Sequence, residues 1–105
     1  MEERTIRERI IELLISTKEP LDVRDIATYL GLDLREADII YDHLRHAAKT
    51  IRRLSEGRLQ LVMQPPYCLN CGYVFKDLDR PRKPSKCPKC KSQRIAPPRF
   101  KIIEV

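Results

Sequence analysis

Four cysteines, arranged as two close pairs, are the residues of this sequence best suited to chemistry. Cys68 and Cys71 form one C-x2-C pair and Cys87 and Cys90 form another, with fifteen residues between the pairs. Two residues between paired cysteines let both sulfur atoms of a tight turn reach one ion at about 2.3 Å. Two such turns complete a tetrahedron, so the spacing predicts one structural zinc ion held by four thiolates.

The cellular compartment decides between metal binding and disulfides. The first residues, MEERTIRERI, are charged and contain no apolar signal-peptide core, and no run of about 18 apolar residues could span a membrane. We therefore expect a cytoplasmic protein without membrane contact, whose reduced thiols favour metal. No cysteine is left as a free nucleophile, and no glycine loop for phosphate or evident carboxylate pair is present, so we expect no enzyme.

The residues around each cysteine pair indicate the local fold. Gly72 follows the first pair, where a left-handed residue is needed, and Lys91 takes that place after the second. The segments YCLNCGYVF and KCPKCKS resemble the metal-binding turns of rubredoxin-like zinc ribbons. We expect a strand over residues 73–75 after the first turn and another over residues 93–96 after the second.

Rubredoxin itself binds iron, so an electron carrier is a minor alternative. The chain has no Trp, and Tyr67, Tyr73 and Phe75 are the only aromatic residues near the cysteines, whereas the rubredoxin core is rich in aromatic residues. A segment of about thirty residues with few large apolar side chains cannot outweigh its own chain entropy. We therefore favour zinc as a structural ion over iron as a redox centre.

The rest of the chain must hold the metal site in place, and its first expected element is a helix at the N-terminus. Its expected buried face consists of Ile6, Ile10, Leu13 and Leu14, at helical spacing. Pro20 is expected to end this helix, because proline disfavours the helical conformation of the residue before it. Ile11 and Ile15 lie off the face; they extend the core or join two copies into a homodimer, and the extended core is favoured.

Two further helices are expected. Asp22 is expected to cap a short helix that Gly31 ends, with the charge of Asp25 at its third position favoured by the positive helix end. Asp33 with Glu36 predicts a capping box for a long third helix. The apolar stripe of the long helix consists of Ala37, Ile40, Tyr41, Leu44, Ala47, Ala48 and Ile51. A turn at residues 55–57 follows.

The segments DIATYLGLD and HLRHAAKTIRRLSEGRLQLV resemble the winged helix-turn-helix of bacterial and archaeal transcription regulators. The first matches the second helix and turn of that family, and the second its recognition helix leading into the wing. This resemblance implies DNA binding, with the long helix in the major groove.

Two alternating segments, residues 58–63 and 99–104, are predicted to pair as the antiparallel strands of a wing. Pro65-Pro66 and Pro97-Pro98 flank the segment that carries the four cysteines, and doubled prolines stop strand pairing. The predicted fold is thus α+β: a winged helix-turn-helix with a rubredoxin-like zinc ribbon inserted at the wing. A tandem of two domains is the less favoured arrangement.

In this arrangement, residues 1–64 and 98–105 form the winged helix-turn-helix, and residues 65–97 form the zinc ribbon. The combination resembles a group of small archaeal proteins predicted to be transcription regulators. That resemblance covers nearly the whole chain and implies DNA binding in the cytoplasm without catalysis.

The charge is unevenly divided. Residues 1–56 sum to −2, whereas residues 57–105 carry eleven Lys or Arg and three Asp or Glu and sum to +8. This basic segment favours a polyanion, double-stranded DNA, over the alternative of a solubilising surface. The candidate DNA contacts are Arg35, Ile39, Arg45, His46, Lys49, Arg52 and Arg53 around the long helix, and Arg80, Arg82, Lys83 and Lys86 in the loop between the cysteine pairs.

Two acidic residues oppose this interpretation. Asp38 and Asp42 share the outward face of the long helix and would repel phosphates, so a protein-docking module of the transcription or translation machinery is the main alternative. The basic loop is interpreted either as a phosphate contact or as a solvated proline-rich loop. His43 and His46 are expected to be surface residues, because four cysteines already complete the metal site.

Overall fold

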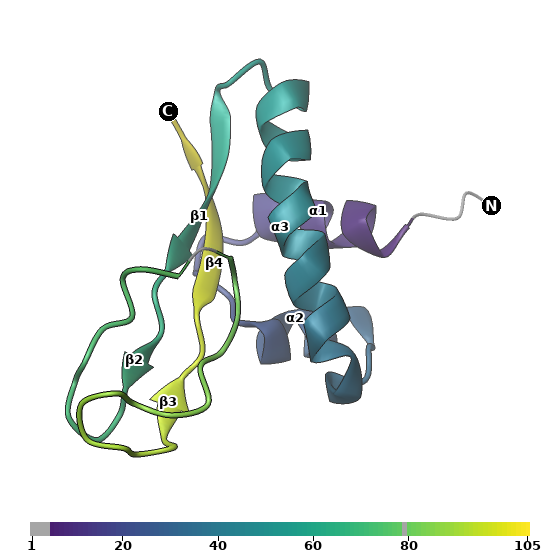
Figure 1. The fold of residues 1–105 in the computed structure, drawn as a ribbon. Coiled ribbons are helices and arrows are strands. Elements are labelled where there is room, and N and C mark those ends of the chain that lie inside the picture. Colours follow the sequence, from purple (N-terminus) through teal and green to yellow (C-terminus); the bar gives the residue numbers. More distant parts are fainter. Residues whose placement is uncertain (1–4, 79) are drawn as a thin grey trace.

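Three helices precede all strands in the chain, and a computed structural model shows how they pack (Figure 1). The structure describes residues 5–78 and 80–105, so the first four residues of the predicted N-terminal segment lie outside it. The elements are α1 (Ile6–Ser16), α2 (Val23–Leu30), the 3-10 turn η1 (Leu34–Glu36), α3 (Ala37–Leu54), β1 (Leu59–Gln64), β2 (Tyr67–Cys68), β3 (Ile95–Ala96) and β4 (Arg99–Glu104). The fold is α+β, and no helix of the described residues is long and apolar enough to cross a membrane.

The ends of α2 are those that the sequence predicts. The Asp22 carboxylate accepts from the Asp25 amide at 2.8 Å, and the Asp25 carboxylate accepts from the Asp22 amide at 3.2 Å. This reciprocal capping satisfies two amide groups that a helix leaves free at its N-terminus. Gly31 ends the helix with φ 69°, in the left-handed region.

The predicted end of α1 is wrong. The helix ends at Ser16, and Thr17 is already extended (φ −102°, ψ 143°), before Pro20 is reached. The Ser16 hydroxyl donates to the Leu13 carbonyl at 2.8 Å and the Thr17 amide donates to the same carbonyl at 3.1 Å. Polar side chains that bond the backbone locally thus end this helix before proline can.

The predicted capping box at the start of the long helix is also wrong. The Asp33 carboxylate accepts from the Arg35 amide at 2.9 Å and from the Arg35 guanidinium at 2.8 Å, and η1 follows. The α-helix proper begins at Ala37, and Glu36 makes no side-chain capping bond. Because Arg35 occupies both oxygens of Asp33, the chain turns tightly here before α3 starts.

β1 and β4 pair antiparallel and lie against the helices (Figure 1). In this pairing Leu59 lies opposite Glu104 and Gln64 lies opposite Arg99. On its other edge, β4 exchanges two backbone hydrogen bonds with Leu21: the Leu21 amide donates to the Phe100 carbonyl at 2.9 Å, and the Phe100 amide donates back at 2.7 Å. The C-terminal strand is therefore held between β1 and the loop that precedes α2.

One core joins the helices to β4. Phe100 is 1% exposed and packs with buried residues of all three α-helices, and its ring meets Tyr41 edge-on with centroids 6.3 Å apart. The prediction that Ile15 extends this core is wrong, because its side chain is 57% exposed. A second, much smaller buried cluster consists of Cys68, Cys87 and Ile95. The molecule thus has a helical core and a separate ribbon core.

Candidate metal centre

A two-stranded sheet and two matching turns position the four cysteines. β2 pairs with β3, which places Cys68 opposite Ile95 at the base of the ribbon. In the first turn the Gly72 amide donates to the Cys68 carbonyl at 2.9 Å. In the second the Lys91 amide donates to the Cys87 carbonyl, also at 2.9 Å. The two cysteine pairs therefore sit in turns of the same hydrogen-bonding pattern.

Both turns need a left-handed residue at the position predicted from the sequence. Gly72 has φ 81° there, and Lys91 has φ 67°. A left-handed conformation disfavours a residue with a Cβ atom by about 1–2 kcal/mol, whereas glycine adopts it freely. The second turn therefore carries backbone strain that the first does not.

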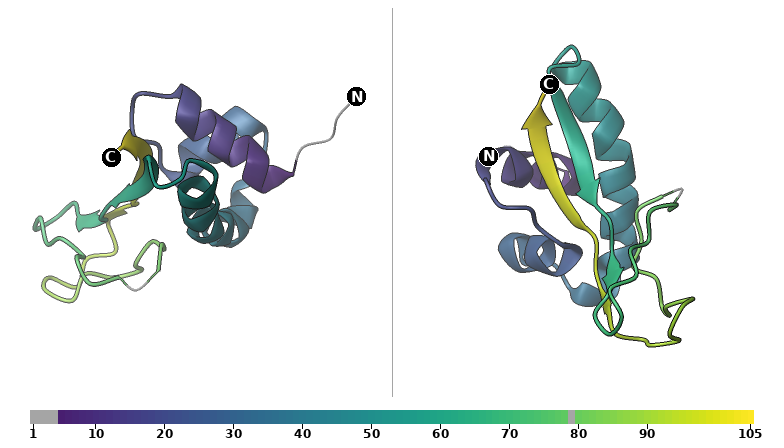
Figure 2. Two further views of the ribbon diagram at one scale, coloured as in Figure 1. Left: turned by 90° about the horizontal axis from the view of Figure 1, so that it is seen from above. Right: turned by 90° about the vertical axis from the view of Figure 1, so that its left-hand side faces the viewer.

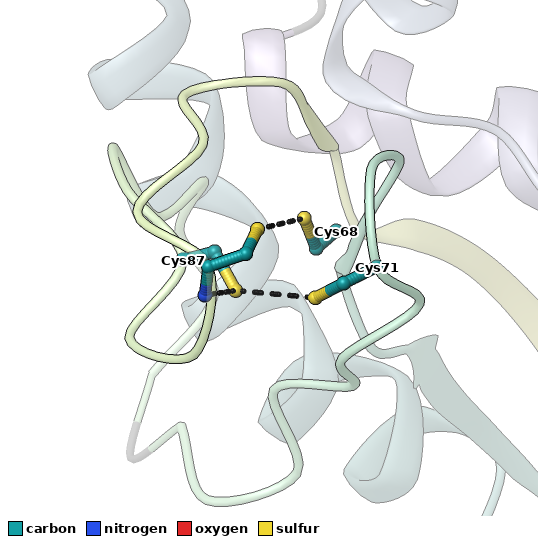
Figure 3. A group of neighbouring side chains, drawn as sticks. Cys68, Cys71 and Cys87 are labelled. Carbon is teal, nitrogen blue, oxygen red and sulfur yellow. Dashed lines mark hydrogen bonds between the residues drawn. The ribbon is translucent and has the colours of Figure 1, made fainter.

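The four sulfur atoms lie together. All four Sγ atoms are within 4.8 Å of one another, with 3.5 Å between Cys68 and Cys90 and 3.6 Å between Cys71 and Cys87. Figure 3 shows Cys68, Cys71 and Cys87 turned toward one another from the two turns. Ligands at about 2.3 Å from a tetrahedral zinc ion are about 3.8 Å apart. These cysteines are free thiols at the spacing of a tetrahedral four-thiolate site, which fits one structural zinc ion.

Hydrogen-bond donors around the sulfur atoms suit thiolates. The Asn70 side-chain amide donates to Cys90 Sγ at 3.5 Å, and the Lys89 amide donates to Cys87 Sγ at 3.3 Å. The Asn70 donor, with the Ser92 backbone, lowers the pKa of the Cys90 thiol to about 6. A low pKa favours the deprotonated form, which is the form that binds metal. Asn70 is a contributor that the sequence analysis did not single out.

The ribbon contains less strand than predicted. Residues 73–75 form no strand; Val74 makes a single bridge to Tyr67, and the rings of Tyr73 and Phe75 meet edge-on at 5.1 Å. The second predicted strand shortens to Ile95–Ala96. The two turns around the sulfur atoms take up the backbone hydrogen bonds that longer strands would use, as in the bond from the Cys87 amide to the Ser92 carbonyl.

The predicted DNA contacts of the long helix do not form one uniform surface. Lys49, Arg52 and Arg53 are exposed on the C-terminal half of α3, and none pairs with a carboxylate of the described residues. Arg45 instead pairs with Asp42 at 2.9 Å, and His46 lies 3.7 Å from the same carboxylate. Ile39 is 51% exposed on this face of α3. Arg35 lies outside the helix, in η1, where its guanidinium lowers the pKa of Asp33.

The basic loop between the cysteine pairs lies beside the helices. Arg80, Arg82 and Lys83 line a cavity of about 670 Å³ together with residues of α2, η1 and the N-terminal half of α3. In both views of Figure 2 the loop approaches α3. Lys86 is exposed and does not line the cavity. Residues 80–83 of the basic loop thus lie at a cavity that the ribbon shares with the helices, and their contact with phosphates stays a prediction.

His43 differs from the predicted surface histidine. It is half-buried, and its Nδ1 atom is buried without a hydrogen-bond partner among the described residues. Burial, with the positive charge of Arg7, lowers the pKa of His43, so its neutral form is favoured. His43 belongs to the contact between α1 and α3 and is not near the four thiols.

Three helices, small antiparallel sheets and a rubredoxin-like zinc ribbon with four cysteines define the class of this protein. Residues 5–59, just over half of the chain, match the family model described as PF0610-like, N-terminal, and residues 65–104 match the PF0610 rubredoxin-like zinc beta-ribbon domain. The chain belongs to the PF0610-like family.

A solved relative has the same fold. The solution NMR structure of protein PF0610 from Pyrococcus furiosus is 33% identical in sequence, with a TM-score of 0.73. The similarity covers 98% of this chain and 95% of the relative. No curated protein matches the chain.

Proposed function

We propose that this protein is a DNA-binding transcription regulator, in which the three helices and the β1–β4 pair act as a winged helix-turn-helix and the zinc ribbon extends the wing. The observation that carries this proposal is the row of unpaired cations on the C-terminal half of α3. Lys49, Arg52 and Arg53 are exposed there, and no carboxylate of the described residues neutralises them. Cations presented on one helix face are suited to the phosphates that border a groove.

The order of the elements supports the same proposal. Gly31 and η1 form a short connection between α2 and α3, and β1, which pairs with β4, follows α3 after a short turn. In winged helix proteins the helix after such a turn lies in the major groove, and the following strand pair contacts the backbone beside it. Phe100 anchors β4 in the helical core, so the strand pair is held at a fixed orientation to α3.

Titration of a labelled DNA duplex at several salt concentrations tests the proposal. Each phosphate contact that releases counterions contributes about −0.9 to the slope of log K against log salt. We expect Lys49→Gln and Arg52→Gln each to reduce the magnitude of this slope by about 1. Arg94→Gln is the matched control, because Arg94 is an exposed cation of the ribbon and does not belong to α3. A binding constant that does not change with salt would exclude DNA as the partner.

A protein-docking function is the second candidate. Three large apolar side chains are exposed on α2, on η1 and at the start of α3: Tyr29 is 66%, Leu34 52% and Ile39 51% exposed. Asp38 precedes Ile39 in the sequence. Apolar side chains surrounded by charge are typical of protein contacts. This function predicts that nuclease-treated extract yields RNA polymerase or factor subunits, and that Ile39→Asp loses them. Recovery that requires nucleic acid would contradict it.

A further inference from the structure

The cavity beside the basic loop is separate from the zinc site. It measures about 670 Å³ and lies between the start of α2, η1, the N-terminal half of α3 and residues 80–83 of the ribbon. None of the four cysteines lines it. Cavities that bind small molecules measure about 300–1,000 Å³ and occur preferentially where two structural units meet. This cavity has that size, and it lies where the ribbon meets the helices.

The charges around the cavity favour an anion. Four cations, Arg24, Arg80, Arg82 and Lys83, line it, and no carboxylate among the described residues pairs with them. A fifth cation, Arg45, is paired with Asp42 at 2.9 Å. Asp38 is the one further acidic residue among the described residues of the lining, whose charges therefore sum to a positive value. Several guanidinium groups around one space are suited to phosphate or carboxylate oxygens.

Apolar side chains lie among these charges in the lining. Leu34, Pro81 and Pro97 contribute aliphatic surfaces, and Tyr41 contributes an aromatic one. The Tyr41 ring is held by its edge-on contact with Phe100. Burial, with the charges of Asp22 and Asp38, raises the pKa of Tyr41 to about 12, so its hydroxyl stays a neutral donor at neutral pH. A small inorganic anion would leave these apolar side chains exposed to water. A ligand that also has a planar apolar group would cover them.

We propose that this cavity binds a small anion with a planar apolar body, and that a nucleoside diphosphate is the chemical class that fits it. The phosphates would lie among Arg24, Arg80 and Arg82, and the ring would lie against Tyr41 and the two prolines. The unpaired carboxylate of Asp38 can accept from an amino group of the ring. The proposal concerns a small-molecule site and does not depend on DNA binding.

The zinc-loaded full chain should be titrated with ADP, and separately with pyrophosphate and with adenosine, at constant ionic strength and without DNA. Calorimetry gives the affinities, and backbone amide NMR shifts give the location. We expect ADP to bind at least about tenfold more tightly than either fragment, because charge and ring are both recognised. The largest shifts are expected in residues 34–45 and 80–83. Arg82→Gln should weaken ADP binding about fivefold, because it removes one charged hydrogen-bond donor.

The matched control is Arg94→Gln, which removes the same charge from the ribbon outside the cavity. It should leave ADP binding unchanged, and circular dichroism should show both variants as stable as the parent. Three results would overturn the proposal: no ADP binding at about 1 mM, pyrophosphate binding as tightly as ADP, or an equal loss in both variants. Failure of these titrations would leave DNA binding unaffected, since the salt-dependent duplex titration measures that separately.

Discussion

Removing the zinc ion is expected to disorder the ribbon while the helices stay folded. The buried cluster of the ribbon contains only Cys68, Cys87 and Ile95, with Phe75 and Cys90 packed against it. None of these belongs to the core shared by the helices and β4. Zinc binding to small four-ligand peptides contributes about 10–16 kcal/mol at neutral pH, far more than such a cluster can supply. Residues 67–96 should therefore lose their structure on chelation.

The effect on the helices follows from the strand pairing. Gln64 and Arg99 are paired, so the intervening residues 65–98 become a flexible loop when the ribbon unfolds. Loop-closure entropy rises with three-halves of RT times the logarithm of the length, so a loop of this length costs about 2 kcal/mol more than a four-residue turn. Domains of this size have stabilities of about 5–15 kcal/mol, so the helical core should remain folded at 25 °C. Its thermal midpoint should fall by roughly 10 °C.

Circular dichroism before and after chelation measures the helices, and amide NMR shifts measure the ribbon. The helical signal should remain at 25 °C, the shifts of residues 67–96 should collapse toward random-coil values, and added zinc should restore those shifts. Chelator saturated with zinc beforehand is the control. Complete loss of helical signal would show that β4 cannot hold Phe100 in the core without the ribbon. Unchanged ribbon shifts would show that zinc does not hold the ribbon together.

Three smaller changes test other contacts. Phe100→Ala should lower the free energy of unfolding by about 3–5 kcal/mol in urea, because it empties the centre of the core, whereas Ile103→Ala on the exposed face should change it by less than about 1 kcal/mol. Lys91→Gly should strengthen zinc binding in a competition titration with a chelator, because it removes the left-handed strain; weaker binding would contradict this. Burial lowers the pKa of His43, so protonation favours the unfolded chain and stability falls as pH drops below about 6.5. This loss should be smaller in His43→Gln than in the parent chain, as measured by urea unfolding from pH 7.5 to 5.5.

Local signals in the sequence predicted the metal centre well. The C-x2-C spacing fixes two sulfur atoms in each turn, and only a left-handed residue fits after the second cysteine, which identifies Gly72 and Lys91 before any tertiary contact is known. The caps of α2 were predictable for the same reason, because Asp22 bonds an amide only three residues away. In each case the determining interaction lies within one turn of chain.

The errors arose where two local solutions compete. Asp33 could cap an α-helix, but its neighbour Arg35 takes both carboxylate oxygens and a 3-10 turn forms instead. At the end of α1, the hydroxyls of Ser16 and Thr17 bond to helix carbonyls, and the helix ends before Pro20. The sequence contains both alternatives in each case, and local side-chain bonds to the backbone decide between them.

The position of the basic loop could not be predicted, because it depends on contacts between distant segments. Residues 80–83 and the start of α3 are separated by about forty residues, and no periodicity links them. Arg24 lines the same cavity, but the sequence did not indicate it as a site residue because exposed arginines are common on short helices. A charge count places cations in the ribbon but does not show which way they face.

The position of the basic loop beside the helices changes which part of the molecule is proposed to contact DNA. Asp38 and Asp42 oppose phosphate contact on the N-terminal half of α3, and the structure places the basic loop and the cavity beside those same residues. Arg45 is used in an ion pair there. The cations that remain unpaired on α3 lie further along, at Lys49 and beyond. Under the proposed function, phosphates therefore meet the C-terminal half of α3, and the N-terminal half with its cavity is free to bind a small anion at the same time.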